Sequence, residues 1–476
     1  MRVLLINPPA DYGIQLRGAE RVWAQHELAP PLGLMSLSAY LKAHGYKEIK
    51  LINGQTPRRV TDAEIIRTVE SYRPEVVGFT VNILYYYNAV RIAKLIKDTD
   101  PSVPIVFGGP HPTLYPEEAV AQPGVDFAVV GEGEYILLEL LQALEKGRDF
   151  SAINGLVWKR GAEIVRNPPR KFHEPLDALP MPDYGLFNPN HYRIRFDDLH
   201  PTALMITSRG CPLRCTFCGQ TQRYYRMRSA ESVVGEMQAL MRLGYRSIGF
   251  FDDNFSLHRK RVLEICRLIR AQELNLPWSF RGRVDRFDEE MVEAITNAGC
   301  RRATFGVESG TQEMLDAVHK RTTMAEIRAA FSLAKKYHLV TMGYFMLGLP
   351  GETLDQARQT MRFAFDVDPD FIVLCPFIPT PGSQIYQEAV ASGALPDYWM
   401  EFARHPTPHL PIKRWETGIT EKQIFKLLYR TYFRFYLRPG KLRAIMGRVS
   451  NWEDLWIKVA TAANVLHHLT SKRLLS

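Results

Sequence analysis

Residues 208–220 read SRGCPLRCTFCGQ, and this stretch decides what the surrounding fold is built to hold. It places Cys211, Cys215 and Cys218 at the spacing CxxxCxxC. Three thiolates can hold three corners of a four-iron cluster, whereas such clusters normally take four Cys ligands. The loop therefore predicts a cluster whose fourth iron is left open for a substrate or a cofactor.

Two other interpretations of these thiols stay open at this point. A zinc ion takes a fourth side chain in a structural site, or three ligands and a water molecule in a catalytic one. No His or Cys lies within the thirty residues after the loop. The thiols could instead be unpaired and structural. The later cysteines, Cys266, Cys300 and Cys375, lie in apolar or strand-like stretches, where Cys usually behaves as a small buried hydrophobe.

Around the loop, residues 201–400 alternate strand and helix patterns. Short apolar runs predict six strands, at Leu204–Thr207, Ser247–Phe251, Ser279–Arg281, Ala303–Val307, Thr341–Leu347 and Phe371–Leu374. Apolar residues at helical spacing predict helices at 233–243, 262–271, 289–298, 325–337 and 354–365. Six βα units are too few for a complete eight-stranded barrel.

The pattern Cys211-x3-Cys215-x-Phe217-Cys218 resembles the signature of radical S-adenosylmethionine (SAM) enzymes. The resemblance implies a partial (β/α)6 barrel of the TIM type with the loop after its first strand. It also implies a [4Fe–4S] cluster whose open iron is chelated by the amino and carboxylate groups of SAM. The reduced cluster of this family cleaves SAM to a 5′-deoxyadenosyl radical, so an electron donor such as flavodoxin or ferredoxin is expected.

Polar or Gly-rich residues follow the predicted strands of this barrel, at the end where barrels bind their ligands. With the resemblance, they give the candidate SAM residues Gly219, Asp252, Asp253, Arg283, Glu308 and Gly351. Gly219 has no Cβ and would let the backbone approach adenosine. Glu308 would accept hydrogen bonds from the ribose, and Arg283 would hold the methionyl carboxylate.

Most of these candidates also have a purely structural interpretation. Asp252 and Asp253 could be solvated carboxylates at a strand end, and Arg283 could pair with Asp285 or Asp252. Gly351 could serve only a strand-to-helix turn. No residue stands out as a general base, so we assign no catalytic side chain from the sequence.

The first 145 residues predict a doubly wound parallel sheet. Five short buried strands alternate with helices, at Val3–Asn7, Ile49–Ile52, Val76–Thr80, Ile105–Gly108 and Phe127–Val130. Such sheets bind ligands beyond the carboxyl ends of their strands. The GGPHP stretch at 108–112, followed by GEGE at 131–134, resembles the cobalamin-binding domain that precedes the barrel in one large subclass of radical SAM enzymes.

This resemblance makes residues at the strand ends candidates for binding cobalamin, namely Asn7, Thr80, Gly108, Gly109, Gly131 and Glu132. The domain lacks the GxGxxG dinucleotide fingerprint. It also lacks the DxHxxG motif that supplies a lower axial His in methionine-synthase-like domains, since Asp198 and His200 have no matching Gly. A His-on mode is therefore not expected, and His111 is interpreted as a turn or edge residue.

Composition sets the wider limits. A chain of 476 residues suggests two or three domains. Six cysteines with three in one loop favour a metal site in a reducing cytoplasm over a disulfide framework. The amino terminus lacks the features of a signal peptide. No apolar run is long enough to span a bilayer, so we expect a cytoplasmic protein that is soluble or peripheral to the membrane.

The remaining segments are a Pro-rich linker at 146–200 and a basic helical tail at 401–476. The tail holds 14 Lys and Arg against 5 Asp and Glu, which accounts for the formal net charge of +9. A basic stripe recurs at every fourth position, at Lys422, Lys426, Arg430, Arg434 and Arg438. This pattern fits either a helical cap with a solvated face, or contact with an anionic lipid or a hydrophobic acidic substrate.

Together these features predict a cobalamin-dependent radical SAM enzyme acting on an unactivated carbon of a small molecule. In the methylase reading, one SAM yields the radical and a second supplies the methyl group through cobalamin. In the cyclase reading, which resembles the anaerobic magnesium-protoporphyrin ester cyclase, no methyl group is transferred. A cobalamin or redox sensor is the alternative of another class. Nucleic acid is not expected as a partner, because the chain has no recognised RNA-binding module.

Overall fold

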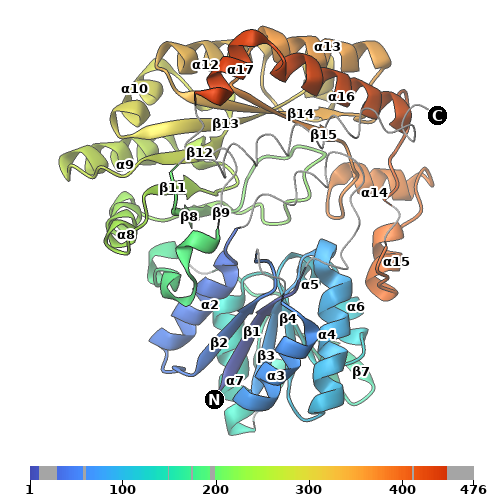
Figure 1. Ribbon diagram of the computed structural model, residues 1–476. Coiled ribbons are helices and arrows are strands. Elements are labelled where there is room, and N and C mark those ends of the chain that lie inside the picture. The colour runs from blue at the N-terminus through green and yellow to red at the C-terminus, as the bar shows by residue number, and fades with distance from the viewer. Residues whose placement is uncertain are drawn as a thin grey trace. The chain divides into compact units, whose positions relative to one another are not determined.

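The computed structural model describes residues 1–9, 29–56, 60–147, 149–172, 175–192, 199–409 and 412–447 (Figure 1). The chain divides into two compact units. The first comprises Met1–Leu16, Leu28–Tyr192 and Asp397–Pro411, and the second comprises Arg17–Glu27, Arg193–Pro396 and Ile412–Ser476.

The first unit is built on a seven-stranded sheet in the order β2-β1-β3-β4-β5-β6-β7. The first five strands are parallel: β1 Val3–Asn7, β2 Ile49–Asn53, β3 Val76–Thr80, β4 Ile105–Gly108 and β5 Phe127–Val129. The helices between and after them are α2 Leu32–Ala43, α3 Asp62–Tyr72, α4 Tyr86–Thr99, α5 Pro110–Leu114, α6 Pro116–Ala121 and α7 Gly133–Lys146. This arrangement confirms the predicted doubly wound sheet.

Burial explains why these strands are visible in the sequence. All five residues of β1 are buried, and strands covered on both faces read as continuous apolar runs. On one face, α2 and α7 pack together, with Leu34, Leu41, Ile136 and Leu140 in the core. The helices α3 and α4 form a second contacting pair.

Part of the predicted irregular linker is regular. Residues 156–166 form the antiparallel strands β6 Leu156–Arg160 and β7 Glu163–Arg166, and β6 extends the sheet by pairing with β5. The prediction missed them because the prolines from Pro168 onward dominate the segment's composition. Single 3-10 turns follow at Leu176–Ala178, Tyr184–Leu186 and Pro189–His191, as elsewhere at Ile83–Tyr85, Phe150–Ala152, Phe255–Leu257 and Val284–Arg286. The domain boundaries given above stay a prediction.

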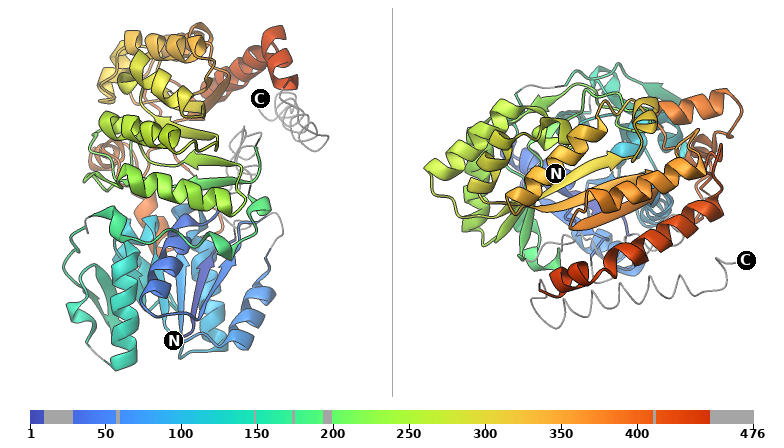
Figure 2. Two further views of the ribbon diagram at one scale, coloured as in Figure 1. Left: turned by 90° about the vertical axis from the view of Figure 1, so that its left-hand side faces the viewer. Right: turned by 90° about the horizontal axis from the view of Figure 1, so that it is seen from above.

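The second unit holds an open sheet of six parallel strands in the order β15-β14-β13-β12-β11-β8. The strands are β8 Thr202–Met205, β11 Ser247–Phe250, β12 Trp278–Gly282, β13 Cys300–Glu308, β14 Val340–Leu347 and β15 Phe371–Pro376. Its helices are α8 Ala230–Arg242, α9 Arg259–Ala271, α10 Glu289–Asn297, α11 Gln312–Ala317, α12 Met324–Lys336 and α13 Leu354–Asp366 (Figure 2). The predicted partial (β/α)6 barrel is confirmed.

The helices that follow the barrel strands are α14 Gln384–Ala391, α15 Tyr398–Arg404, α16 Glu421–Tyr436 and α17 Pro439–Met446. The basic helix α16 is not separate from the barrel. It packs on β15 and α13, and the hydroxyls of Tyr432 and Tyr436 accept hydrogen bonds from the backbone N–H groups of Leu374 at 2.8 Å and Ile372 at 3.0 Å. The side chains of Lys426, Arg430 and Arg434 are exposed.

The predicted apolar face around Trp452 and Trp456 lies outside the described residues. Among the residues that the structure describes, no helix is long and apolar enough to cross a membrane.

Candidate functional site

The three-cysteine loop begins in a short two-stranded element, β9 Ser208–Arg209 paired with β10 Arg226–Met227. Gly210 has a φ of +84°, and a Cβ there would overlap the backbone of Tyr224. The N–H of Cys211 donates to the carbonyl of Gln222 at 3.0 Å, and that of Cys218 donates to the carbonyl of Cys215 at 3.1 Å. The first of these contacts joins the two ends of the loop, and the second forms a turn inside it.

The thiols lie in a partly buried setting, with two cations near Cys215. Cys215 is buried, while Cys211 and Cys218 are half-buried. Burial raises the pKa of the Cys211 and Cys215 thiols, and the nearby cations of Lys320 and Arg283 act in the opposite direction on the pKa of Cys215. These cations favour the thiolate, which is the form that binds metal.

The donor set fits an iron–sulfur cluster. Such clusters are held by Cys thiolates, and Cys211, Cys215 and Cys218 lie together on one loop. Within the described ranges, no three His, Cys, Asp or Glu side chains converge as ligands of one metal ion.

A buried ion pair lies beside this loop. Lys320 Nζ is 2.7 Å from Glu308 Oε1, and the same ammonium is 5.9 Å from the centre of the Phe217 ring. Glu308 has a φ of +70° at the end of β13, where the register shifts against β14. A Cβ on Gly306 would lie 2.9 Å from Lys320 Nζ, so glycine leaves room for the pair.

Lys320 was missed by the sequence analysis. It lies in the short loop between α11 and α12, which contains no recognised motif. Only the return of the chain to the end of β13 brings it against Glu308.

Arg283 forms the ion pair with Asp285 that its structural interpretation predicted. Its Nε donates to Asp285 Oδ1 at 2.9 Å, and Nη2 donates to the carbonyls of Lys320 at 2.7 Å and Arg321 at 3.2 Å. Arg283 thus pairs with Asp285 and braces the backbone that presents Lys320. Its contact with the SAM carboxylate stays a prediction.

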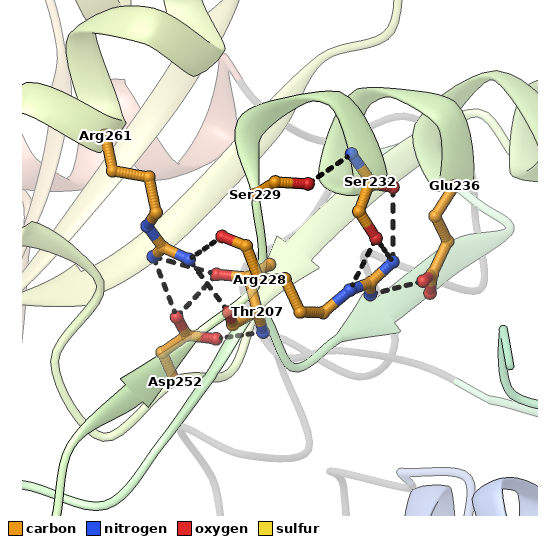
Figure 3. A network of polar contacts seen from close by, with 7 residues as sticks. All are labelled: Thr207, Arg228, Ser229, Ser232, Glu236, Asp252 and Arg261. Carbon is orange, nitrogen blue, oxygen red and sulfur yellow. Dashed lines mark hydrogen bonds and ion pairs between the residues drawn. The ribbon is translucent and has the colours of Figure 1, made fainter. Parts of the chain in front are cut away.

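The two neighbouring aspartates have different surroundings. Asp252 is buried and accepts hydrogen bonds at 2.6 Å from the N–H and hydroxyl of Thr207 and from the hydroxyl of Ser208. Arg261 lies 3.5 Å from the same carboxylate (Figure 3). This network ties the end of β11 to the segment that enters the cysteine loop, and the contact of Asp252 with SAM stays a prediction.

Asp253 faces the other end of the loop. It accepts a hydrogen bond from Gln220 Nε2 at 2.6 Å, and burial raises the pKa of its carboxyl. The charge of Asp253 also contributes to the raised pKa of Cys211. Asp253 is therefore near the cysteine loop, and its predicted contact with SAM stays a prediction.

The two candidate glycines are required for different reasons: Gly219 for close packing, and Gly351 for its left-handed backbone conformation. A Cβ on Gly219 would lie 2.8 Å from the carbonyl oxygen of Pro381. Gly351 has a φ of +79°, and its N–H donates to Thr417 Oγ1 at 2.6 Å.

The next residue, Glu352, is fully buried. Burial raises the pKa of its carboxyl to about 7, although this carboxyl accepts a hydrogen bond from the N–H of Gly348 at 2.5 Å.

In the first unit, the predicted cobalamin residues lie at the carboxyl edge of the sheet. Asn7 is buried, donates to Asn53 Oδ1 at 2.7 Å and accepts from Gln55 Nε2 at 3.3 Å. Asn53 in turn donates to the Tyr192 hydroxyl at 3.0 Å. This network shapes the edge at β1 and β2.

The other candidates follow β3, β4 and β5. A Cβ on Gly109 would lie 3.3 Å from Thr80 Oγ1, whereas one on Gly131 would meet nothing within 4 Å. Gly109 and Gly131 have φ values of +103° and +88°, and Gly108 and Glu132 are half-buried beside them. The space beside Gly131 is open, which fits close approach by a ligand.

His111 differs from its prediction as a turn or edge residue. It is 1% exposed within α5, and its ring centroid lies 3.8 Å from that of Tyr86. Neither ring nitrogen has a hydrogen-bond partner, and burial lowers its pKa to about 3. His111 is therefore a neutral core residue at physiological pH.

The fold and the loop define a class: an iron–sulfur half-barrel enzyme that also carries a doubly wound ligand-binding domain. Residues 205–364 match the family model of the radical SAM superfamily, and residues 26–141 match that of the B12 binding domain. The chain belongs to the radical SAM enzymes with a B12-binding domain. Its cofactors are a [4Fe–4S] cluster, SAM and cobalamin.

Similar proteins include both predicted activities. An uncharacterized methyltransferase of Pyrococcus horikoshii is 33% identical over 93% of this chain and 94% of its own length. The anaerobic magnesium-protoporphyrin IX monomethyl ester cyclase of Rubrivivax gelatinosus is 31% identical over 82% of this chain and 70% of its own. The solved structure of OxsB with aqua-cobalamin and SAM has a TM-score of 0.71 and 19% identity, covering 98% of this chain and 72% of that one.

Proposed function

We propose that this enzyme transfers a methyl group from SAM to an unactivated carbon of a small molecule. The observation that carries the proposal is the three-cysteine loop beside the buried pair of Lys320 and Glu308, in a chain similar along 93% of its length to a methyltransferase. When bound, the cluster supplies an electron that cleaves SAM, and cobalamin supplies the carrier for the methyl group.

The residues of the barrel divide the binding of SAM between them. Cys211, Cys215 and Cys218 would hold three irons. Glu308 would accept hydrogen bonds from the ribose hydroxyls, since ionised acceptors form the stronger hydrogen bonds. Lys320 is the better-placed cation for the methionyl carboxylate, because the Arg283 guanidinium already donates hydrogen bonds to Asp285 and to two backbone carbonyls.

The carboxyl edge of the first unit would hold cobalamin. Gly108, Gly109 and Gly131 offer backbone that a large ring can approach, and Thr80, Asn7 and Glu132 offer polar groups around it. The buried, neutral His111 supports a mode in which no histidine of this edge ligates cobalt.

Anaerobic reconstitution with iron, sulfide, cobalamin and a strong reductant tests the proposal. The protein is incubated with SAM whose methyl group carries deuterium and with an extract of host cells that lack the protein. We expect 5′-deoxyadenosine and a product that gains one labelled methyl group. Absence of 5′-deoxyadenosine under every reductant contradicts the radical mechanism.

Radical-mediated cyclisation is the second candidate, and the 31% identity to the protoporphyrin ester cyclase favours it. It would use the same cysteine loop and the same ion pair. The labelling experiment separates the two, because a new ring without label excludes the methyltransferase and supports the cyclase.

The exposed basic row on α16, Lys426, Arg430 and Arg434, supports an anionic partner. We propose that the substrate is hydrophobic and acidic, and that the enzyme is cytoplasmic and contacts anionic lipid at the membrane surface. We also propose that flavodoxin or ferredoxin reduces the cluster. Sedimentation with vesicles containing phosphatidylglycerol, compared with phosphatidylcholine alone, tests the lipid contact. Reversing all three charges should abolish any preference for the anionic vesicles.

A further inference from the structure

The segment 412–420, which we call the strap, reaches the same apolar cluster as the cysteine loop. The cluster consists of the buried residues Met314, Val318, Leu349, Phe377 and Ile385. Phe217, between the second and third cysteines, packs against it, and so does Trp415 from the strap. Almost two hundred positions separate these two aromatic residues in the sequence.

The strap is tied to the ends of two barrel strands. After β14, the N–H of Gly351 donates to Thr417 Oγ1 at 2.6 Å. After β15, the carbonyl of Phe377 accepts from Arg414 Nη1 at 3.0 Å. These contacts hold the strap at the carboxyl ends of the strands, which is also where the cysteine loop lies.

The strap also fits closely against the turn after β14. A Cβ on Gly418 would lie 2.5 Å from the carbonyl oxygen of Glu352. Backbone atoms cannot rotate away from such a contact, so the strap can lie this close only because residue 418 is glycine.

We propose that Trp415 is a positioning residue for SAM binding. Its indole packs on the cluster that supports Phe217, and in this way it sets the geometry of the loop that carries Cys215 and Cys218. Trp415 remains half-buried, so the cluster does not enclose its indole completely. This inference rests on the proposed function, because it concerns SAM binding by the reconstituted enzyme.

The test compares variants of the reconstituted full-length protein by iron content, by the affinity for SAM, and by the change that SAM causes in the electron paramagnetic resonance spectrum of the reduced cluster. For Trp415→Ala we expect unchanged iron and an affinity for SAM about tenfold weaker, equivalent to about 1.4 kcal/mol. Trp415→Phe should restore most of the affinity. Phe433→Ala, which truncates an aromatic residue that is 41% exposed on α16, is the control.

A second variant displaces the strap without removing any contact group. Gly418→Ala should weaken SAM binding in the same direction, while Gly440→Ala, whose Cβ would meet nothing within 4 Å, should not. If wild type binds SAM and both Trp415→Ala and Gly418→Ala match it, the inference is overturned and the proposed function stands. If Trp415→Ala loses iron while Gly418→Ala keeps full affinity, the role of Trp415 is structural only. If the wild-type protein binds no SAM, the result contradicts the proposed function, and the inference on Trp415 falls with it.

Discussion

The ammonium of Lys320 lies 2.7 Å from the carboxylate of Glu308, and the two side chains are only 7% and 11% exposed. Breaking a buried pair leaves an uncompensated charge, which costs about 3 to 5 kcal/mol. The pair also lies beside Cys215, whose pKa responds to both charges. It therefore connects the stability of the barrel to the cofactor site.

Lys320→Met should lower the free energy of unfolding by about 3 kcal/mol and weaken SAM binding, while the fold stays the same. Denaturant unfolding and equilibrium dialysis measure the two effects. Lys336→Met is the matched control, because Lys336 pairs with Glu289 at the surface, with both side chains more than half exposed; exposed pairs contribute at most about 1 kcal/mol. Equal effects of the two variants would contradict a special role for Lys320.

Cys215→Ala should abolish the iron–sulfur absorbance after anaerobic reconstitution, because only two thiolates of the loop remain. Cys266→Ala is the control, since Cys266 lies buried in α9 and burial raises its pKa to about 12, which keeps it a thiol. Iron and sulfide analysis gives the result directly. Full cluster content in Cys215→Ala would rule out the ligand assignment.

Asp252→Asn should destabilise the protein without a specific change in SAM affinity. The amide loses the negative charge that accepts from Thr207 and Ser208, and hydrogen bonds to charged groups contribute about 1.5 to 3 kcal/mol each. Asp355→Asn, at an 80% exposed side chain in an i,i+3 pair, should leave the melting temperature nearly unchanged. A stable Asp252→Asn variant with lost SAM binding would instead place Asp252 in the cofactor site.

Glu352 predicts a pH dependence of stability. Its pKa is raised from 4.5 to about 7 by burial, so the folded state binds the proton more tightly than the unfolded state. The resulting stability is present below pH 4.5 and is lost as the pH rises to about 7, by about 3 kcal/mol. Glu352→Gln should flatten this part of the profile between pH 5 and 8.

Denaturant midpoints across that range measure the effect. Glu388→Gln, an exposed substitution on α14, should keep the wild-type slope. A wild-type profile that stays level from pH 5 to 8 would show that Glu352 is already ionised in the folded protein.

The strands and helices were predictable because their signals are local. Buried parallel strands such as β1 and β5 are short, almost wholly apolar runs, and the intervening helices repeat apolar residues every three or four positions. The hairpin of β6 and β7 was not predicted, because its two strands are short and the prolines that follow them indicate an irregular segment. The spacing of Cys211, Cys215 and Cys218 was equally visible, since all three ligands lie on one loop.

By itself, the sequence determined the class of chemistry. It places three thiolates after the first strand of a half-barrel, where they would hold a cluster whose fourth iron is open. The tertiary structure decided which residues serve that loop. Asp252 and Arg283 brace the chain through hydrogen bonds that the sequence did not show, and their contacts with SAM stay predictions. Lys320 and Trp415 carried no motif and come close to the cysteine loop only through folding. The physical reason is that hydrogen-bond partners and packing depend on contacts between distant segments, which local periodicity does not encode.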